Sequence, residues 1–208
     1  MKGALVTGAG MRVGRALAMA LAADGFFAFV HYNRSAGPAR ETVAAITAAG
    51  GKAKAADFDL HMAVNLRAPL LLSQAVARQL PASETGVIVN MLDQKLFNLN
   101  SDFLTYTLSK VGLQGLTTLL AQSFAPRLRV AGIAPGLTLR SGSQTDARFA
   151  QQHTENPLRV GVTPADLVRA LRFIMATPTF TGDVLIVDSG EHLSGRPRDI
   201  AFDTKTKK

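Results

Sequence analysis

Short runs of β-forming residues alternate with helical patterns along almost the whole chain. The expected strands are 3–6, 26–32, 52–58, 86–92, 128–133 and 183–187. The expected helices are 13–23, 39–49, 61–80, 102–124 and 165–176, the last opened by Pro164. This alternation is typical of a parallel sheet covered by helices. The sequence therefore predicts an α/β fold, with residues 1–208 forming a single domain and an irregular tail from about residue 194.

Composition and charge exclude several classes of function. The chain has no cysteine, which rules out disulfides, zinc–thiolate sites and thiol nucleophiles. Lysine and arginine total 23 against 15 acidic residues, but they are scattered, and no aromatic residues are interleaved with a basic stripe as stacking platforms for nucleic acid. No apolar run reaches the ~20 residues of a membrane span, and no His, Asp and Glu cluster suggests a metal. We expect a cytoplasmic protein with no nucleic-acid or membrane partner, whose anionic ligand is small, such as a nucleotide phosphate.

One connection does not fit the alternating pattern. After the third expected strand the chain enters the helix at His61 directly, where the pattern requires a helix, a strand and a second helix. A crossover between parallel strands needs at least ~10–12 residues. A missing central strand would leave two rows of unpaired backbone groups. We therefore expect strand four and its flanking helix to be missing, and a segment of several tens of residues to be omitted between Leu60 and His61.

A glycine-rich turn lies between the first expected strand and the first expected helix. It runs from Thr7 to Gly14, and its candidate cofactor-binding residues are Gly8, Met11, Arg12, Val13 and Gly14. Glycines let the backbone approach a pyrophosphate, whose charge sits at the helix N-terminus. Such a turn is weak evidence alone, because it can be purely structural, but this position at the start of an alternating chain favours dinucleotide binding.

The second expected strand ends without an acidic residue. Its last residues, all candidate cofactor ligands, are His31, Tyr32, Asn33, Arg34 and Ser35. An acid here would bind the ribose hydroxyls of NAD and repel a phosphate. Arg34 and Ser35 can instead bind a 2′-phosphate together with Arg12, which favours NADPH over NADH. The alternative is a solvated Arg-Ser pair at a strand end.

These two segments resemble the short-chain dehydrogenase/reductase family. The turn of that family is Thr-Gly-x-x-x-Gly-x-Gly, and Thr7, Gly8 and Gly14 match it. Arg12 replaces the middle glycine and, with the His-Tyr-x-Arg-Ser stretch, is similar to the pteridine reductase branch. The resemblance implies a Rossmann-type doubly wound parallel sheet and an NADPH-dependent oxidoreductase. It also implies that Asp59, in the pair Asp59-Leu60, meets the adenine amino group.

Tyr106 and Lys110 stand four residues apart on the expected helix 102–124, and so share one face. An ammonium beside a phenol lowers the pKa of the phenol toward neutrality, which suits a general acid. Tyr-x-x-x-Lys alone is common on solvated faces. The resemblance implies that Tyr106 donates the proton and that Lys110 holds the nicotinamide ribose and tunes Tyr106. It further implies that Asn65 holds a water in the proton relay.

Asp93 stands thirteen residues before Tyr106, where the family usually has serine and where pteridine reductases resemble this chain in having Asp. An ionised Asp has no proton to donate to a carbonyl oxygen, but it suits ring N–H and amino groups. The alternative is that Asp93 only accepts a bond from a nearby amide. After the next strand, the Pro-Gly loop that the family places beside the nicotinamide matches Pro135, Gly136 and, less firmly, Thr138.

The sequence thus favours an NADPH-dependent reductase of a C=N bond in a pterin-like heterocycle. The family's Asn-Asn-Ala-Gly or Asn-Asn-Ala-Ser stretch, after which pteridine reductases have an aromatic residue, is absent. Two alternatives stay open: a carbonyl reductase of another substrate, such as a 3-oxoacyl thioester or a sugar, and a nucleotide-binding protein without turnover. The resemblance also implies a homotetramer formed through the two long helices 61–80 and 102–124.

Overall fold

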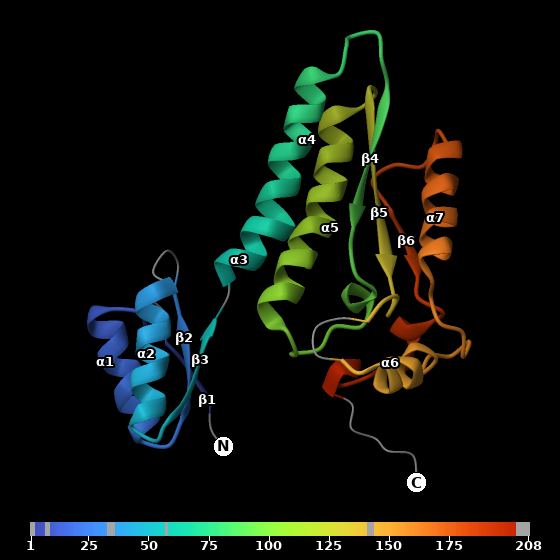
Figure 1. The fold of residues 1–208 in the computed structure, drawn as a ribbon. Helices are drawn as coiled ribbons and strands as arrows, with labels where there is room; N and C mark the ends of the chain where they lie inside the picture. Colours follow the sequence, from blue (N-terminus) through green and yellow to red (C-terminus); the bar gives the residue numbers. More distant parts are fainter. Residues whose placement is uncertain (1–2, 7–8, 33–35, 57, 141–143, 203–208) are drawn as a thin grey trace. The chain divides into compact units, whose positions relative to one another are not determined.

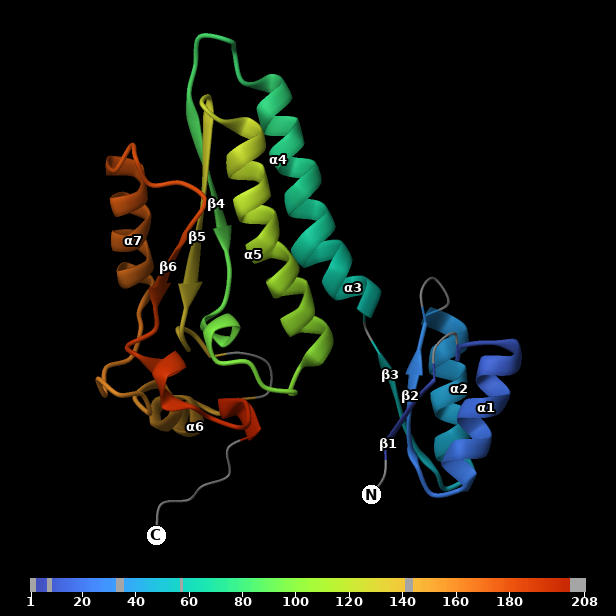
Figure 2. The same ribbon diagram turned by 180° about the vertical axis from the view of Figure 1, so that it is seen from behind.

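The computed structural model describes residues 3–6, 9–32, 36–56, 58–140 and 144–202. They fall into two compact units, Met1–Val64 and Asn65–Lys208. Each unit is built around its own three-stranded parallel sheet with helices packed on it (Figures 1 and 2). The α/β class and the parallel strand pairing expected from the sequence are confirmed.

The first unit has the strand order β1-β2-β3, with β1 at Gly3–Val6, β2 at Phe27–His31 and β3 at Lys52–Ala56. Helices α1 (Arg12–Ala23) and α2 (Ala36–Ala48) contribute Ala18, Ala22, Ala39 and Ile46 to one core with Ala28 and Val30 of β2. Many of these side chains are small, so the helices approach the sheet closely.

Alternate residues of β2 point away from this core. Phe27 and Phe29 lie on the opposite face of the sheet, with ring centroids 4.9 Å apart, and Phe29 is 41% exposed. Strands of a parallel sheet are usually covered on both faces. The first unit therefore presents an aromatic face that α1 and α2 leave open.

One helical run connects β3 to the second sheet. It consists of α3 (Phe58–Met62), a π-helical turn η1 (Ala63–Arg67) and α4 (Ala68–Gln79). Leu60 and His61 are consecutive residues of α3, so the helix continues through the point where the sequence suggests an omitted segment. That segment remains a prediction.

The second unit has the strand order β4-β5-β6, with β4 at Gly86–Met91, β5 at Leu128–Pro135 and β6 at Val184–Val187. Helices α4 and α5 (Leu104–Phe124) lie on one face of this sheet, and α7 (Pro164–Ala176) lies on the other (Figures 1 and 2). The central strand β5 is buried on both sides: Val130 packs with Leu120, and Ile133 packs with Ile174. The carboxyl ends of these strands carry the candidate site.

The expected strands and helices are all present, with bounds that differ by at most a few residues. Helix α6 (Asp146–His153) was not predicted, because its sequence is mostly polar and has no apolar stripe. It begins after Thr145, whose hydroxyl accepts a hydrogen bond from the Arg148 amide. The tail expected to be irregular from about residue 194 contains the 3₁₀ turn η4 (Ile200–Phe202), and another 3₁₀ turn, η3 (Glu191–Ser194), leads into it.

The expected single sheet is divided into two in the described residues. β1 pairs there only with β2, and β4 pairs only with β5, each through one edge. A strand between β1 and β4 is the one that the sequence pattern lacks. Among the described helices, none is both long enough and apolar enough to cross a membrane.

Candidate active site

Asp93 and Tyr106 meet at the carboxyl end of β4. Asp93 follows β4 by two residues and caps the 3₁₀ turn η2 (Gln94–Phe97), where its Oδ1 accepts a 2.9 Å hydrogen bond from the Lys95 amide. Tyr106 lies in the first turn of α5, and its hydroxyl donates a 2.7 Å hydrogen bond to Asp93 Oδ2. Both carboxylate oxygens are therefore held in place. Asp93 thus accepts a hydrogen bond from a backbone amide, as the alternative interpretation predicts, and it also accepts one from the phenol of Tyr106.

Lys110 lies one helical turn after Tyr106. Its Nζ is 5.7 Å from the centroid of the Tyr106 ring and donates a 2.7 Å hydrogen bond to the Met91 carbonyl oxygen. Burial lowers the pKa of Lys110, and the nearby Asp93 carboxylate acts in the opposite direction. The expected shared face is confirmed, with the ammonium bonded to the end of β4.

The pKa of Tyr106 is raised, which corrects the expectation that Lys110 brings it toward neutrality. Burial is the largest cause, followed by the negative charge of Asp93 and the hydrogen bond to it. A phenolate would be desolvated and would face a carboxylate, and the Lys110 ammonium does not offset these effects. Tyr106 is therefore a neutral phenol whose proton lies between two oxygen atoms.

Asn65 is linked to the backbone of Tyr106 through the side chain of Ser109. Its Nδ2 donates a 3.0 Å hydrogen bond to Ser109 Oγ, and Ser109 donates a 2.6 Å bond to the Tyr106 carbonyl oxygen. Ser109 is completely buried. Asn65 belongs to the π-helical turn η1, a geometry that is frequent at functional sites. The described contacts link Asn65 to helix α5, while its expected role in a water relay remains a prediction.

The loop after β5 lies beside a buried acid that the sequence did not point to. Gly136 donates its amide to the Val187 carbonyl oxygen at 2.9 Å, and the Thr138 hydroxyl donates to the Gly136 carbonyl oxygen at 2.9 Å. The Leu137 amide donates a 3.1 Å bond to Glu191 Oε2. Burial raises the pKa of Glu191, while the Leu137 amide acts to lower it. No spacing in the sequence indicates Glu191, because its contact with this loop is tertiary.

The nucleotide-binding turn is described from Ala9 onward. Ala9 is buried, and the Gly10 carbonyl oxygen accepts a 3.3 Å hydrogen bond from the buried hydroxyl of Thr42 in α2. Arg12 has φ +52°, a left-handed conformation that favours glycine, and its side chain is exposed. This is the position where the family has its middle glycine. Arg12 thus presents a cation at the start of α1 from a backbone conformation that glycine adopts more readily.

The other expected nucleotide ligands of the first unit differ in their surroundings. Met11 caps α1 without a side-chain hydrogen bond, and the first turn of α1 contains no acid, which suits an anionic group there. Val13 is exposed and Gly14 is half-buried. Tyr32 is 8% exposed and packs in the core of this unit, so its side chain stabilises the fold.

The expected cofactor-binding residues include several beyond the part of the chain that the structure describes. Gly8, Asn33, Arg34 and Ser35 lie outside the described residues, as does the side chain of His31. Asp59 lies in the first turn of α3, and Leu60 beside it is exposed. Asp59 Oδ2 is buried and has no hydrogen-bond partner among the described residues. A donor such as the adenine amino group would satisfy that oxygen.

Residues 44–192 match the family described as enoyl-(acyl carrier protein) reductase. Carbonyl reductase family member 4 of Danio rerio is 33% identical over 143 residues, which are 68% of this chain and 60% of the relative. This match therefore takes in less than two thirds of the length of that relative.

An uncharacterized oxidoreductase of Methylorubrum extorquens is 28% identical over an alignment of 243 residues that takes in 97% of the relative. The alignment takes in 91% of this 208-residue chain, or about 189 residues. About 54 of its 243 positions therefore lie opposite gaps in this chain. Among solved structures, FolM alternative dihydrofolate reductase 1 from Brucella suis, in complex with NADP, is 31% identical with a TM-score of 0.64. That comparison covers 93% of this chain and 96% of the other.

Proposed function

The chain belongs to the short-chain dehydrogenase/reductase family of oxidoreductases, and on this premise we propose that it uses NADPH to reduce a C=N bond of a pterin-like heterocycle. The observation that carries the substrate class is the 2.7 Å hydrogen bond between the Tyr106 hydroxyl and the Asp93 carboxylate. A carboxylate replaces the hydroxyl that would donate to a carbonyl substrate. It can bind the ring N–H and amino groups that a pterin presents.

The residues of the second unit have separate tasks in this reaction. NADPH, when bound, would supply the hydride for the new C–H bond and would be oxidised to NADP⁺. The Tyr106–Asp93 pair delivers the proton that forms the new N–H bond as the C=N π bond breaks. Lys110, 5.7 Å from the Tyr106 ring, supplies positive charge near the oxygen that loses the proton.

The residues of the first unit fit the nucleotide. The Arg12 guanidinium stands at the start of α1, where the helix dipole favours phosphate. Asp59 has a buried acceptor oxygen that an adenine amino group can satisfy. We propose that Arg12, Arg34 and Ser35 bind the 2′-phosphate, and that the backbone of Gly8–Gly14 faces the pyrophosphate. The NADP complex of the Brucella suis relative supports this choice of cofactor.

Two other functions have specific support. The name of the Danio rerio relative, a carbonyl reductase, favours a carbonyl compound, such as a 3-oxoacyl thioester, as substrate. The division of the expected sheet into two three-stranded sheets favours a nucleotide-binding protein without turnover. The name of the Brucella suis relative, an alternative dihydrofolate reductase, supports the pterin class instead.

One assay separates these functions. NADPH oxidation is followed with dihydrobiopterin, dihydrofolate and an acetoacetyl thioester at equal concentrations, and NADPH binding is measured separately by calorimetry. We expect turnover with at least one of the two pterins and a lower kcat/KM for the thioester. A preference for the thioester would favour the carbonyl reductase. NADPH binding with no turnover of any substrate would favour the third function.

We expect Arg34→Ala to weaken NADPH binding at least tenfold and to leave NADH binding nearly unchanged. A charge-assisted contact contributes ~1.5–3 kcal/mol, and ~1.4 kcal/mol is a factor of ten in affinity. Calorimetric titration with both cofactors measures the change. Arg40→Ala, which removes an exposed arginine of α2, is the control. Equal losses for NADPH and NADH would show that Arg34 acts through the structure and not through the 2′-phosphate.

A further inference from the structure

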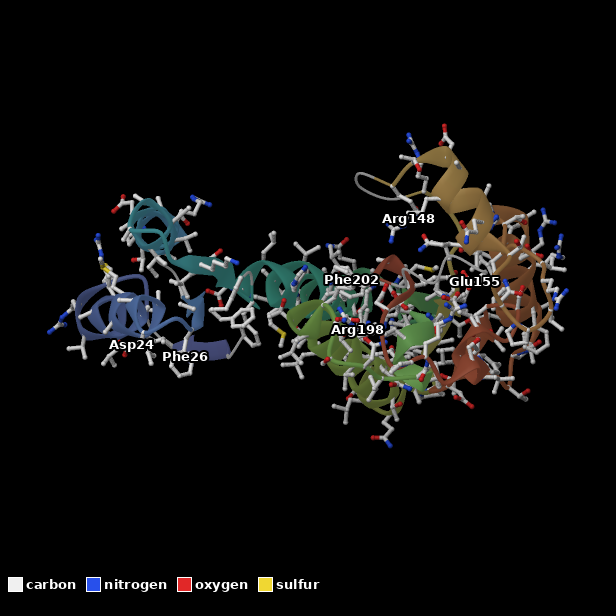
Figure 3. All side chains as sticks on the ribbon, turned by 90° about the horizontal axis from the view of Figure 1, so that it is seen from below. Asp24, Phe26, Arg148, Glu155, Arg198 and Phe202 are labelled. Atoms are coloured by element: carbon white, nitrogen blue, oxygen red, sulfur yellow. The ribbon has the colours of Figure 1, made fainter. Side chains whose placement is uncertain are left out.

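The C-terminal segment Arg198–Phe202, called here the strap, contacts three parts of the second unit: the residues just before α5, the helix α6 and the η2 turn. Arg198 Nε donates to both carboxylate oxygens of Asp102, at 3.0 and 2.8 Å. Phe202 stacks on Phe103 with ring centroids 5.1 Å apart, and Arg198 lies over the Phe202 ring (Figure 3). Two side chains of α6 donate hydrogen bonds to the backbone of the strap: Arg148 to the Ala201 carbonyl oxygen and Gln152 to the Ile200 carbonyl oxygen.

The strap also supplies the partner of a buried lysine. Lys95 is 4% exposed, and its Nζ donates to Asp199 Oδ2 at 2.8 Å and to Asn100 Oδ1 at 2.6 Å. A buried ammonium is costly unless it is paired and hydrogen-bonded. The side chain of Lys95 is therefore held in one position by Asp199, a residue 104 positions later in the chain.

The backbone of the same lysine orients Asp93. The Lys95 amide donates a hydrogen bond to Asp93 Oδ1, and Asp93 Oδ2 accepts a hydrogen bond from the Tyr106 hydroxyl. The chain of contacts from Asp199 through Lys95 and Asp93 to Tyr106 is thus continuous. Each link is a hydrogen bond of 2.9 Å or less.

The strap binds the start of α5 as well. The Asp199 amide donates a 2.8 Å hydrogen bond to Asp102 Oδ2, two residues before α5 begins. Asp199 therefore bridges the η2 turn, which follows Asp93, and the helix that carries Tyr106. This one residue thus contacts both segments that carry the partners of the Asp93–Tyr106 hydrogen bond.

We infer that Lys95 and Asp199 are positioning residues, through which the strap holds the Asp93 carboxylate in hydrogen-bonding contact with Tyr106. The inference deepens the proposed reductase function and rests on it for its effect on turnover. A reacting group displaced by about 1 Å can lose a hundredfold in rate. Loss of the Lys95–Asp199 pair should therefore reduce the rate of the chemical step and spare cofactor binding.

The test compares Asp199→Ala, Asp199→Asn and the control Asp146→Ala. Asp146, the first residue of α6, forms an exposed ion pair with Arg140 and takes part in none of the strap contacts described above, so its replacement removes a carboxylate of the same unit without removing a strap contact. We expect Asp199→Ala to lower kcat about tenfold, with the KM for NADPH within twofold of wild type. Asp199→Asn should restore part of kcat, because its amide oxygen can still accept from Lys95. Asp146→Ala should match wild type.

A second measurement does not depend on turnover. Hydrogen exchange of the Lys95 amide, which is bonded to Asp93, should be faster in Asp199→Ala, intermediate in Asp199→Asn and unchanged in the control. Wild-type kcat and Lys95 exchange in Asp199→Ala would overturn the inference, as would equal losses in kcat and NADPH affinity with unchanged exchange. If Asp199→Ala does not fold, Asp199→Asn decides by the same criteria. If the wild type shows no turnover, the proposed function fails, and the exchange rates still decide the role of the strap.

Discussion

Asp93→Asn and Asp93→Ser should each reduce the kcat for pterin reduction by about a hundredfold, the usual scale for a general acid–base group. Both variants remove the carboxylate that accepts the 2.7 Å hydrogen bond from the Tyr106 hydroxyl and that would bind the amino groups of the substrate. Residual carbonyl reduction should survive or increase in Asp93→Ser, because serine can donate to a developing oxyanion. Steady-state kinetics with a pterin and an acetoacetyl thioester measures both effects. Unchanged pterin turnover would remove Asp93 from the mechanism.

The same variants should also change the ionisation of Tyr106. The charge of Asp93 and its hydrogen bond both raise the pKa of Tyr106, so Asp93→Asn should lower that pKa and let the phenolate form at a lower pH. The chain has two Tyr and no Trp, so tyrosinate absorbance is easy to follow. Comparison of each protein with its Tyr106→Phe counterpart isolates Tyr106. A titration that Asp93→Asn leaves unchanged would show that Asp93 does not control the phenol.

Gly136→Ala should destabilise the second unit by about 1–3 kcal/mol, the usual cost of overpacking. A Cβ at this position would lie 2.9 Å from the Asp188 Cα and 2.8 Å from Glu191 Oε2. One of these two atoms belongs to the backbone, which cannot rotate away from the new methyl group. Movement of the loop would also displace the Leu137 amide from Glu191. Urea denaturation measures the free energy of unfolding.

Gly115→Ala is the matched control for this variant. Gly115 lies in the middle of α5, and a Cβ there would meet nothing within 4 Å. Alanine in a helix interior is favoured over glycine by about 0.5–1 kcal/mol, so this variant should be more stable than wild type. Equal effects of the two substitutions would show that close packing at Gly136 does not govern the stability of the loop.

Local patterns predicted most of the elements, because most strands are short apolar runs and the long helices have an apolar side. The strand 3–6 agrees with β1, and helix 102–124 differs from α5 only at its start. Pro164 was expected in the first turn of α7 and is its first residue. Helix α6 lacks an apolar stripe, so its existence depends on its cap and on tertiary contacts that periodicity does not reveal.

The candidate site was predictable where residues share one element and less so where they meet through tertiary structure. The spacing of Tyr106 and Lys110 placed them on one helix face, but the direction of the Tyr106 pKa shift depends on burial and on Asp93. Asp199 comes from the tail expected to be irregular and Glu191 lies just before it, and only their contacts show their importance. The expected segment at Leu60–His61 remains a prediction.

The wide turn at Ala63–Arg67 has a consequence for how this helix can evolve. A π-helical turn is equivalent to one extra residue accommodated in an α-helix. Deletion of a single residue there would restore regular α-helical geometry, while the flanking turns keep their places and the side chains within the turn change direction. The helix would survive such a deletion, but Asn65 would leave Ser109. Point substitutions in this turn should therefore be tolerated far better than a change of length, and length here is a more sensitive marker of a working site than residue identity.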